Sequence, residues 1–346
     1  MAVAGCGTHT ARVVDRNGAT VATADVLTET EWTRTLDAVS TARVTIQPDG
    51  DCCNRLGRVS TWRHRLMIFR DEQYVWDGPV TGISWSLGQV ELRAQDVLAW
   101  LDNRVPHASR TFTNVDLAEI AAWLIEDGYA PDDPGHTVRV VDPAGVTGSR
   151  TYTIGVGQTG DHLRQLAEAG IDFTAIGSTI LLLPETHMAN VGRLSDVDLP
   201  EGLEVAEDGA SLVTRWVVAG SEDSGAIGSF GGVDPYYGLH ERYVEMSEIT
   251  DNTSAAEAAK ARQRVSRVVP VFVDTQQVTI SPDAAIDVPS LVPGWTLDVT
   301  SASTCRQVSQ RLKITGVRVQ ETGGDEDTPG TESVQVQVAA SGAEAA

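Results

Sequence analysis

Short runs of alternating hydrophobic and polar residues fill much of the first hundred positions. They occupy 11–14, 42–46, 66–69, 74–76 and 90–94. A period of two places successive side chains on opposite faces of a strand. Ser86-Leu87-Gly88 and Arg70-Asp71-Glu72 have the composition of hairpin connections. We therefore predict an antiparallel β-domain over residues 1–104, closed by a helical turn at 96–103.

The pattern changes to a helical period in residues 105–199. Leu117, Ile120, Ala121 and Leu124 form one apolar stripe, with Thr113 or Asn114 as the expected N-cap and Gly128 as the expected end. A second helix is expected from Asp161 to Gly170. It is followed by a hairpin that turns at Gly177-Ser178. This segment predicts an α/β domain of two helices plus a hairpin.

Residues 200–346 return to strand-like runs, interrupted by an Ala-rich helix expected at 255–268. The strand-like runs lie at 212–219, 243–246, 271–273, 277–280, 296–300, 311–322 and 333–339. We predict a second β-domain here. The predicted fold class is α+β and mainly β, with two antiparallel β-barrel or sandwich domains flanking the α/β domain.

The charge balance is strongly acidic, with 48 Asp and Glu against 26 Lys and Arg and a net charge of -22. Such a surface repels phosphate backbones and anionic lipid, so stable nucleic-acid binding is not expected. No apolar run approaches the ~20 residues that span a bilayer, and the N-terminus lacks a signal-peptide pattern. We therefore expect no membrane insertion.

No catalytic, metal-binding or cofactor-binding set emerges from the reactive residues. Cys6, Cys52, Cys53 and Cys305 lack zinc spacing, and no HExxH or GxSxG occurs. The seven histidines are interpreted as surface or loop residues. Asp132-Asp133 with Asp142, and Asp325-Glu326-Asp327, lack the spacing of a calcium loop and are interpreted as solvated turns. We expect a protein that is not an enzyme.

Gly155-Val156-Gly157-Gln158-Thr159-Gly160 matches GxGxxG, follows a strand-like run and opens a helix. Asp161 places a carboxylate where a pyrophosphate would sit, and a hairpin follows in place of a crossover. We interpret this segment as a turn that leads into a helix.

Asp234-Pro235-Tyr236-Tyr237-Gly238 combines a turn former with two adjacent aromatic residues. Aromatic side chains on loops often anchor interfaces. Tyr236 and Tyr237 are therefore candidate interface residues, and the alternative is that they cover a local core.

Several segments, taken in order, resemble the phage tail hub and minor tail protein family, here without a C-terminal lytic extension. They cover most of residues 25–340. They are Glu31-Trp32-Thr33-Arg34 to Ile46, Asp77-Gly78-Pro79-Val80 with 88–104, 161–184, Tyr237-Gly238 to Val265, and Leu291-Val292-Pro293-Gly294 with the final strands.

The resemblance implies two tail-tube-like β-domains and a homotrimer that adapts a sixfold tube to a threefold tip. The implied partners are the distal tail protein, the tape-measure protein and a tail-tip or fibre protein, with DNA passing through the channel. The implied location is the virion tail, assembled in the host cytoplasm. An acidic channel wall agrees with DNA passage. The alternatives are a tail-tip module that binds a receptor or carbohydrate through Trp62, Trp76 and Trp85, and a tail-associated cell-wall hydrolase.

Overall fold

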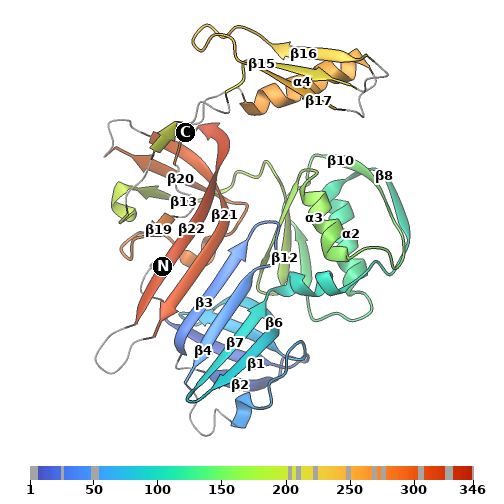
Figure 1. Ribbon diagram of the computed structural model, residues 1–346. Coiled ribbons are helices and arrows are strands. Elements are labelled where there is room, and N and C mark those ends of the chain that lie inside the picture. Colours follow the sequence, from blue (N-terminus) through green and yellow to red (C-terminus); the bar gives the residue numbers. More distant parts are fainter. Residues whose placement is uncertain are drawn as a thin grey trace. The chain divides into compact units, whose positions relative to one another are not determined.

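The computed structural model forms two compact units, each considered by itself (Figure 1). Unit 1 comprises residues 1–202 and 275–341 with 345–346, and unit 2 comprises 203–274 with 342–344. The structure describes residues 7–24, 27–47, 54–201, 205–207, 212–220, 225–246, 251–266, 271–273, 278–302, 308–323 and 330–344. The elements are mostly strands, which confirms the predicted α+β, mainly β class.

Unit 1 is built on one large sheet of twelve strands. Their bounds are β1 (His9–Val14), β2 (Thr20–Ala24), β3 (Leu27–Thr35), β4 (Thr41–Ile46), β5 (Arg65–Arg70), β6 (Gln73–Ser86), β7 (Gln89–Gln95), β13 (Asn190–Ser195), β19 (Val278–Ile280), β20 (Thr296–Ser301), β21 (Val308–Thr322) and β22 (Thr331–Glu344). The strand order is β13-β20-β21-β3-β4-β7-β6-β5-β1-β2, and β22 pairs with β19 and β21. The β13–β20 pair in this sheet is parallel.

The beginning and the end of the chain meet in this sheet, because β21 pairs with β3. The segment that precedes β19 forms unit 2, so the predicted third block of residues 200–346 is divided between the two units. The helix predicted at 255–268 therefore belongs to unit 2 and not to the closing β-strands. The alternation of hydrophobic and polar residues could not reveal this division. It shows which side chains share a face of a strand, but not which distant strand lies beside it.

Two segments that carry the family resemblance contact each other in unit 1. Trp32 on β3 is fully buried and its indole Nε1 donates to His9 Nε2 on β1, 3.0 Å away. Arg34, also buried, donates to the carbonyls of Pro289 and Leu291 at 2.8 and 2.9 Å and to that of Val75 at 3.0 Å. The Trp32–Arg34 step thereby fixes the turn that leads into the closing strands.

The long strand β6 pairs first with β5 and then with β7, and Gly78 lies at a point of close approach. A Cβ at Gly78 would overlap the backbone carbonyl of Gln95. Only glycine fits there, because the obstructing atom is backbone and cannot rotate away.

A buried ion pair joins the first β-block to the closing strands. The Arg70 guanidinium on β5 contacts the Glu332 carboxylate on β22 through two hydrogen bonds of 2.6 and 2.7 Å. Both side chains are almost completely buried. The Arg70 partner favours the ionised carboxylate, so the pKa of Glu332 is lowered although burial alone would raise it.

The α/β part of unit 1 packs two helices on short sheets. The elements are η1 (Val97–Asn103), β8 (Arg110–Asp116), α2 (Leu117–Tyr129), β9 (Thr137–Val140), β10 (Thr147–Tyr152), α3 (Thr159–Ala167), β11 (Ile171–Ile176) and β12 (Thr179–Pro184). The predicted apolar stripe of α2 is buried against α3, β11 and β12. The predicted hairpin at Gly177-Ser178 is confirmed as β11–β12.

The predicted N-cap of α2 is wrong. Thr113 and Asn114 lie within β8, and the Asp116 carboxylate caps the helix by accepting from the N–H of Ala118 at 2.9 Å. Asp116 also accepts from the N–H groups of Ala144 and Gly145. Thr113 and Asn114 cannot cap the helix because the strand continues to Asp116, which directly precedes the first helical residue.

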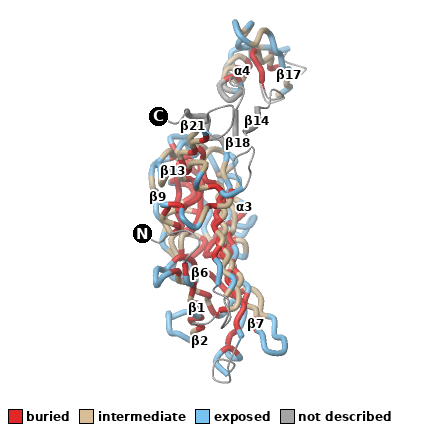
Figure 2. The backbone as a smooth tube through the Cα atoms, turned by 90° about the vertical axis from the view of Figure 1, so that its left-hand side faces the viewer, coloured by how far each residue is buried: buried red, intermediate tan, exposed pale blue. Residues whose placement is uncertain are grey.

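Unit 2 is a small sheet covered on one face by a helix. Its elements are β14 (Val205–Glu207), β15 (Arg215–Ala219), β16 (Ile227–Gly231), β17 (Glu241–Glu245), α4 (Asn252–Ser266) and β18 (Val271–Val273). The order β16-β15-β17 places β15 in the centre. Val218, Ala255 and Ala259 are the buried residues of its apolar cluster. Figure 2 shows much more buried backbone in unit 1 than in this unit.

Candidate assembly interface

The predicted interface residues Tyr236 and Tyr237 lie on the loop between β16 and β17 of unit 2. Tyr236 is 86% exposed, whereas Tyr237 is half-buried. Their rings meet edge to face with centroids 4.8 Å apart. Tyr236 therefore lies at the surface, and the half-buried Tyr237 packs against its ring.

Backbone hydrogen bonds hold this loop in one conformation. Asp234 and Gly238 exchange N–H to carbonyl hydrogen bonds of 2.8 and 2.9 Å. The Asp234 carboxylate also accepts from the N–H groups of Tyr236 and Tyr237 at 2.8 and 3.0 Å. An aspartate that bonds to the backbone two and three residues later forms a rigid turn. The aromatic pair is therefore pre-organised.

Thr214 anchors both ends of the loop at the start of β15. Its carbonyl accepts from the N–H of Gly232 at 2.9 Å, and its hydroxyl accepts from the N–H of His240 at 2.8 Å. The Thr214 hydroxyl also lies 3.2 Å from the carbonyl of Gly238. Pre-organisation of this kind lowers the entropy lost when a loop binds a partner.

The strand pairing defines an exposed sheet face next to this loop. Ala219 pairs with Ile227 and Val217 pairs with Tyr243, while Gly228 contacts the backbone of α4 on the opposite face. Ile227 and Tyr243 are more than half exposed. Val233 and Leu239 are further exposed apolar side chains on the adjoining loop, whereas the exposed Phe230 lies two residues from Gly228 and therefore on the face that α4 covers. A rigid aromatic loop beside exposed apolar residues is typical of a protein-binding surface.

The three tryptophans considered for carbohydrate binding do not form a set. Trp76 is in the core and donates through its indole to the carbonyl of Thr33 at 3.2 Å. Trp62 is 43% exposed and Trp85 is 50% exposed. A carbohydrate platform could therefore use Trp62 or Trp85 but not Trp76.

The GxGxxG segment has a structural role in the fold. Gly155 and Gly157 have positive φ angles of 74° and 77°. The N-terminus of α3 faces the carboxylates of Asp102 and Asp161, which both pair with Arg164, at 2.9 and 2.7 Å. A Cβ at Gly160 would overlap Asp102, so this carboxylate lies against the helix and disfavours a phosphate there.

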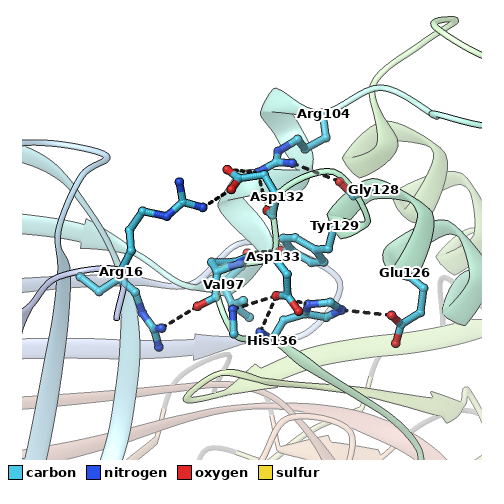
Figure 3. Close-up of polar contacts among 12 residues, drawn as sticks. Arg16, Val97, Arg104, Glu126, Gly128, Tyr129, Asp132, Asp133 and His136 are labelled. Atoms are coloured by element: carbon cyan, nitrogen blue, oxygen red, sulfur yellow. Dashed lines mark hydrogen bonds and ion pairs between the residues drawn. The ribbon is translucent and has the colours of Figure 1, made fainter. Parts of the chain in front are cut away.

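The acidic and histidine candidates are held by neighbours within the protein. Asp133 accepts from His136 Nδ1 at 2.7 Å and from the N–H of Gly135, also at 2.7 Å (Figure 3). These bonds hold the pKa of Asp133 below its usual value against the opposing effect of burial. Groups of three or more metal-ligating side chains are absent from the described residues. Asp325, Glu326, Asp327 and the four cysteines lie outside them.

The expectation that every histidine lies on the surface or in a loop is wrong for His9. This residue lies on β1 and is buried between Trp32 and Glu321, whose carboxylate is 2.7 Å from His9 Nδ1. His64 lies in a loop but is also buried. Sequence did not indicate the burial of His9, because its partners Trp32 and Glu321 are far away in the chain.

No protein-family model and no curated protein matches the sequence. Solved structures of phage tail proteins share its fold. The 43 kDa tail protein of prophage MuSo2 from Shewanella oneidensis superposes with a TM-score of 0.61 at 12% identity, covering 96% of this chain and 98% of that one. A tail protein from Neisseria meningitidis gives 0.59 at 14% identity, with coverage of 95% and 96%.

A prophage tail protein from Listeria monocytogenes gives a TM-score of 0.57 at 11% identity, covering 95% of this chain and 94% of that one. The fold of this chain is thus the fold of phage tail proteins, along nearly the whole length of both chains. The predicted resemblance is confirmed at this level. Among the described residues, no helix is long and apolar enough to cross a membrane.

Proposed function

We propose that this chain is the structural hub at the distal end of a phage-type tail tube. In this function it assembles as a homotrimer, adapts a sixfold tube to a threefold tip, and docks the distal tail, tape-measure and tip or fibre proteins. It works in the virion tail after assembly in the host cytoplasm. The single observation that carries the proposal is the fold shared with tail proteins from end to end.

We assign the two proposed tail-tube-like β-domains to two parts of the large sheet, which meet where β3 pairs with β21. One comprises the N-terminal strands β1–β7, and the other comprises β13 and β19–β22. The α/β part of residues 105–189 lies between them in sequence. Unit 2 is an additional element that the sequence did not separate. The net charge of -22 agrees with a channel through which DNA passes without adhering.

The Tyr236 loop supports a role in docking. It offers an exposed, pre-organised aromatic side chain beside apolar residues, and such a surface suits contact with another protein better than catalysis. A receptor- or carbohydrate-binding role is the second candidate function. The half-exposed Trp62 and Trp85 are the observation that favours it.

Light scattering of the purified chain, alone and co-expressed with its tail partners, tests the trimer. The hub proposal predicts a complex of about three times the 36.9 kDa mass of one chain. A monomer in both preparations would contradict it. Binding of the purified chain to host cells, lost in Trp85→Ala but kept in Tyr236→Ala, would instead support the second candidate.

A further inference from the structure

The α/β part of unit 1 is joined to the large sheet at the turn between β3 and β4. In this turn the N–H of Asp37 donates to the carbonyl of Phe173 on β11, and the N–H of Phe173 donates to the Asp37 carboxylate, both at 2.8 Å. The Thr174 hydroxyl donates to the carbonyl of Thr35 at 3.1 Å. Because β11 lies at the edge of its three-stranded sheet, Asp37 takes the place of a further strand there.

The backbone conformation of Asp37 suits this contact. Its φ angle is 59°, in the left-handed region where aspartate and asparagine are enriched over other residues that have a side chain. Asparagine can therefore adopt the same conformation and present the same acceptor oxygen to the Phe173 N–H. Asp37→Asn thus removes the titratable proton while the backbone contact can remain.

Negative charges outnumber positive charges around the Asp37 carboxyl group. The charged groups that act on it are Asp172 on β11, Glu185 after β12 and Lys313 on β21. The Lys313 ammonium donates to the Asp172 carboxylate and to the carbonyl of Glu185, the latter at 2.9 Å. When all are ionised, three carboxylates thus face one ammonium group, whose nearest partner is already Asp172.

His187 is a further titratable group beside this cluster, and it acts on Asp172. Its Nδ1 lies 3.3 Å from the carboxylate of Asp142, and its ring packs against that of Trp295 with centroids 4.9 Å apart. A protonated His187 is balanced by Asp142, and a neutral one adds no positive charge. In both states the excess of carboxylates around Asp37 remains.

Burial makes this excess costly. The side chains of Asp172 and Lys313 are only 5% and 13% exposed, so water screens their charges weakly. Burial raises the pKa of Asp37 from 3.8 to about 7, and Asp172 and Glu185 act in the same direction, against the Phe173 N–H and Lys313. Between these two values the closed contact holds a proton that Asp37 would lose in water. The contact is therefore strongest in mild acid and weakens as pH rises through neutrality.

An apolar cluster next to these charges does not titrate. Leu181 and Leu183 on β12 pack with Val292, which precedes β20, and with Leu36 and Trp295. This apolar contact between the α/β part and the large sheet is independent of pH. Loss of the Asp37–Phe173 contact would therefore free the edge of β11 without detaching the α/β part.

We propose that the Asp37–Phe173 contact is a pH-sensitive joint within unit 1. It is closed while the Asp37 carboxyl group holds a proton, and it loosens when that proton is lost to water. Loosening releases the edge of β11 from the β3–β4 turn, so the α/β part gains freedom to move against the large sheet. This proposal does not depend on the hub function, because it concerns contacts within one chain.

Hydrogen exchange of the Phe173 amide in the full chain, followed by NMR at pH 5 and pH 8 and corrected for the intrinsic pH dependence of exchange, tests the proposal. The Val44 amide on the central strand β4 is the reference for opening of the whole sheet. Relative to Val44, protection of Phe173 should be about tenfold or more greater at pH 5 than at pH 8. Asp37→Asn should abolish this difference. Asp298→Asn is the matched control, since that carboxylate pairs with Arg311 at 2.8 Å in the same sheet, and it should keep the difference.

A second measurement follows the Asp37 carboxyl group itself by carbon NMR. Glu185 is exposed, so Glu185→Gln should fold normally, and removal of its charge should lower the pH midpoint of Asp37. This titration decides the matter even where Asp37→Asn fails to fold. A wild-type midpoint near the ordinary value of 3.8 would overturn the proposal. So would Phe173 protection that changes with pH equally in the wild type and in Asp37→Asn.

Discussion

Units 1 and 2 use their apolar residues in opposite ways. Unit 1 buries its large side chains in a sheet that joins the two ends of the chain, with Trp32, Trp76 and Leu66 almost completely inaccessible. Among the residues of unit 2 that the structure describes, the buried cluster contains one valine and two alanines, while Ile227, Tyr236 and Tyr243 are exposed. The difference shows that unit 1 has the larger buried core, and it agrees with our proposal that the Tyr236 loop of unit 2 docks a partner.

Gly78→Ala should have the largest effect, and it tests the scaffold. The added Cβ overlaps the carbonyl of Gln95, so β6 must move from its neighbours and we expect a loss of about 3 kcal/mol or more. Gly88→Ala is the control, because it has a positive φ but open space, and should cost about 1 kcal/mol. Urea unfolding measures both, and equal losses would contradict the close-approach explanation.

Glu332→Gln tests the ion pair that joins the first and last strands of unit 1. It removes the buried counter-charge of the Arg70 guanidinium, which then keeps only the more exposed carboxylate of Asp71 at 3.2 Å, and we expect a loss of about 3 kcal/mol at neutral pH. The more exposed pair of Arg318 and Glu31 provides the control, since Glu31→Gln should cost less than about 1 kcal/mol.

The same pair gives a pH dependence with a definite sign. The folded-state pKa of Glu332 is lowered, so its contribution is present above the unfolded pKa of about 4.5 and is lost as pH falls through the folded pKa. Glu332→Gln should lack this loss of stability in acid. A variant whose acid unfolding matches the wild type would contradict the assignment.

Val218→Ala tests whether the two units unfold independently of each other. It removes the largest side chain from the buried cluster of unit 2, and we expect a loss of about 2 kcal/mol confined to residues 203–274. Hydrogen exchange should show faster exchange in β15–β17 and unchanged protection in β3 and β4. Loss of protection in both units together would show that they unfold as one, and would contradict a difference in stability between unit 1 and unit 2.

Asp96→Asn tests a buried carboxyl of the scaffold. Burial raises the pKa of Asp96 from 3.8 to about 7, although the N–H groups of Ser40 and Leu98 oppose this shift. Between these values the folded protein holds a proton that the unfolded chain has lost, so the contribution of Asp96 to stability falls as pH rises. The stability of Asp96→Asn relative to wild type should therefore increase from pH 5 to pH 8. A difference that is constant with pH would contradict a raised pKa.

Tyr236→Ala should have the smallest effect on stability and a clear effect on assembly. The side chain is exposed, so the free energy of unfolding should change by less than about 0.5 kcal/mol. Incorporation into tails should nevertheless fall. Tyr74→Ala in unit 1 is the contrasting variant, because the Tyr74 hydroxyl bonds to Asp77 at 2.7 Å and its loss should lower stability. Normal incorporation of Tyr236→Ala would refute a docking role for the loop.

Local pattern predicted most of the individual elements but not their assembly. The stripe from Leu117 to Leu124 and the turn at Gly177-Ser178 are local features, and α2 and the β11–β12 hairpin follow from them. The pairing of β21 with β3 depends on strands almost 300 residues apart, which no local period encodes. For the same reason, local pattern could not show that unit 2 is separate from the closing strands.

The candidate sites show the same limit. Tyr236 and Tyr237 could be named from composition, because turn formers flank two aromatic residues. The small pocket lined by Arg16, Arg63 and Arg104 could not, since these arginines come from three separate segments without a shared motif. The net charge of -22 also gave no sign of these arginines. A net charge summed over the whole sequence does not show where residues of the opposite charge cluster.

Immunogold labelling of complete particles tests the central proposal most directly. A tag at the C-terminus of this chain would be located by electron microscopy in particles that assemble with it. The hub proposal predicts gold at the end of the tail tube distal to the head, in every tailed particle. Gold along the whole tube or at the head, or particles that lack the chain, would contradict it.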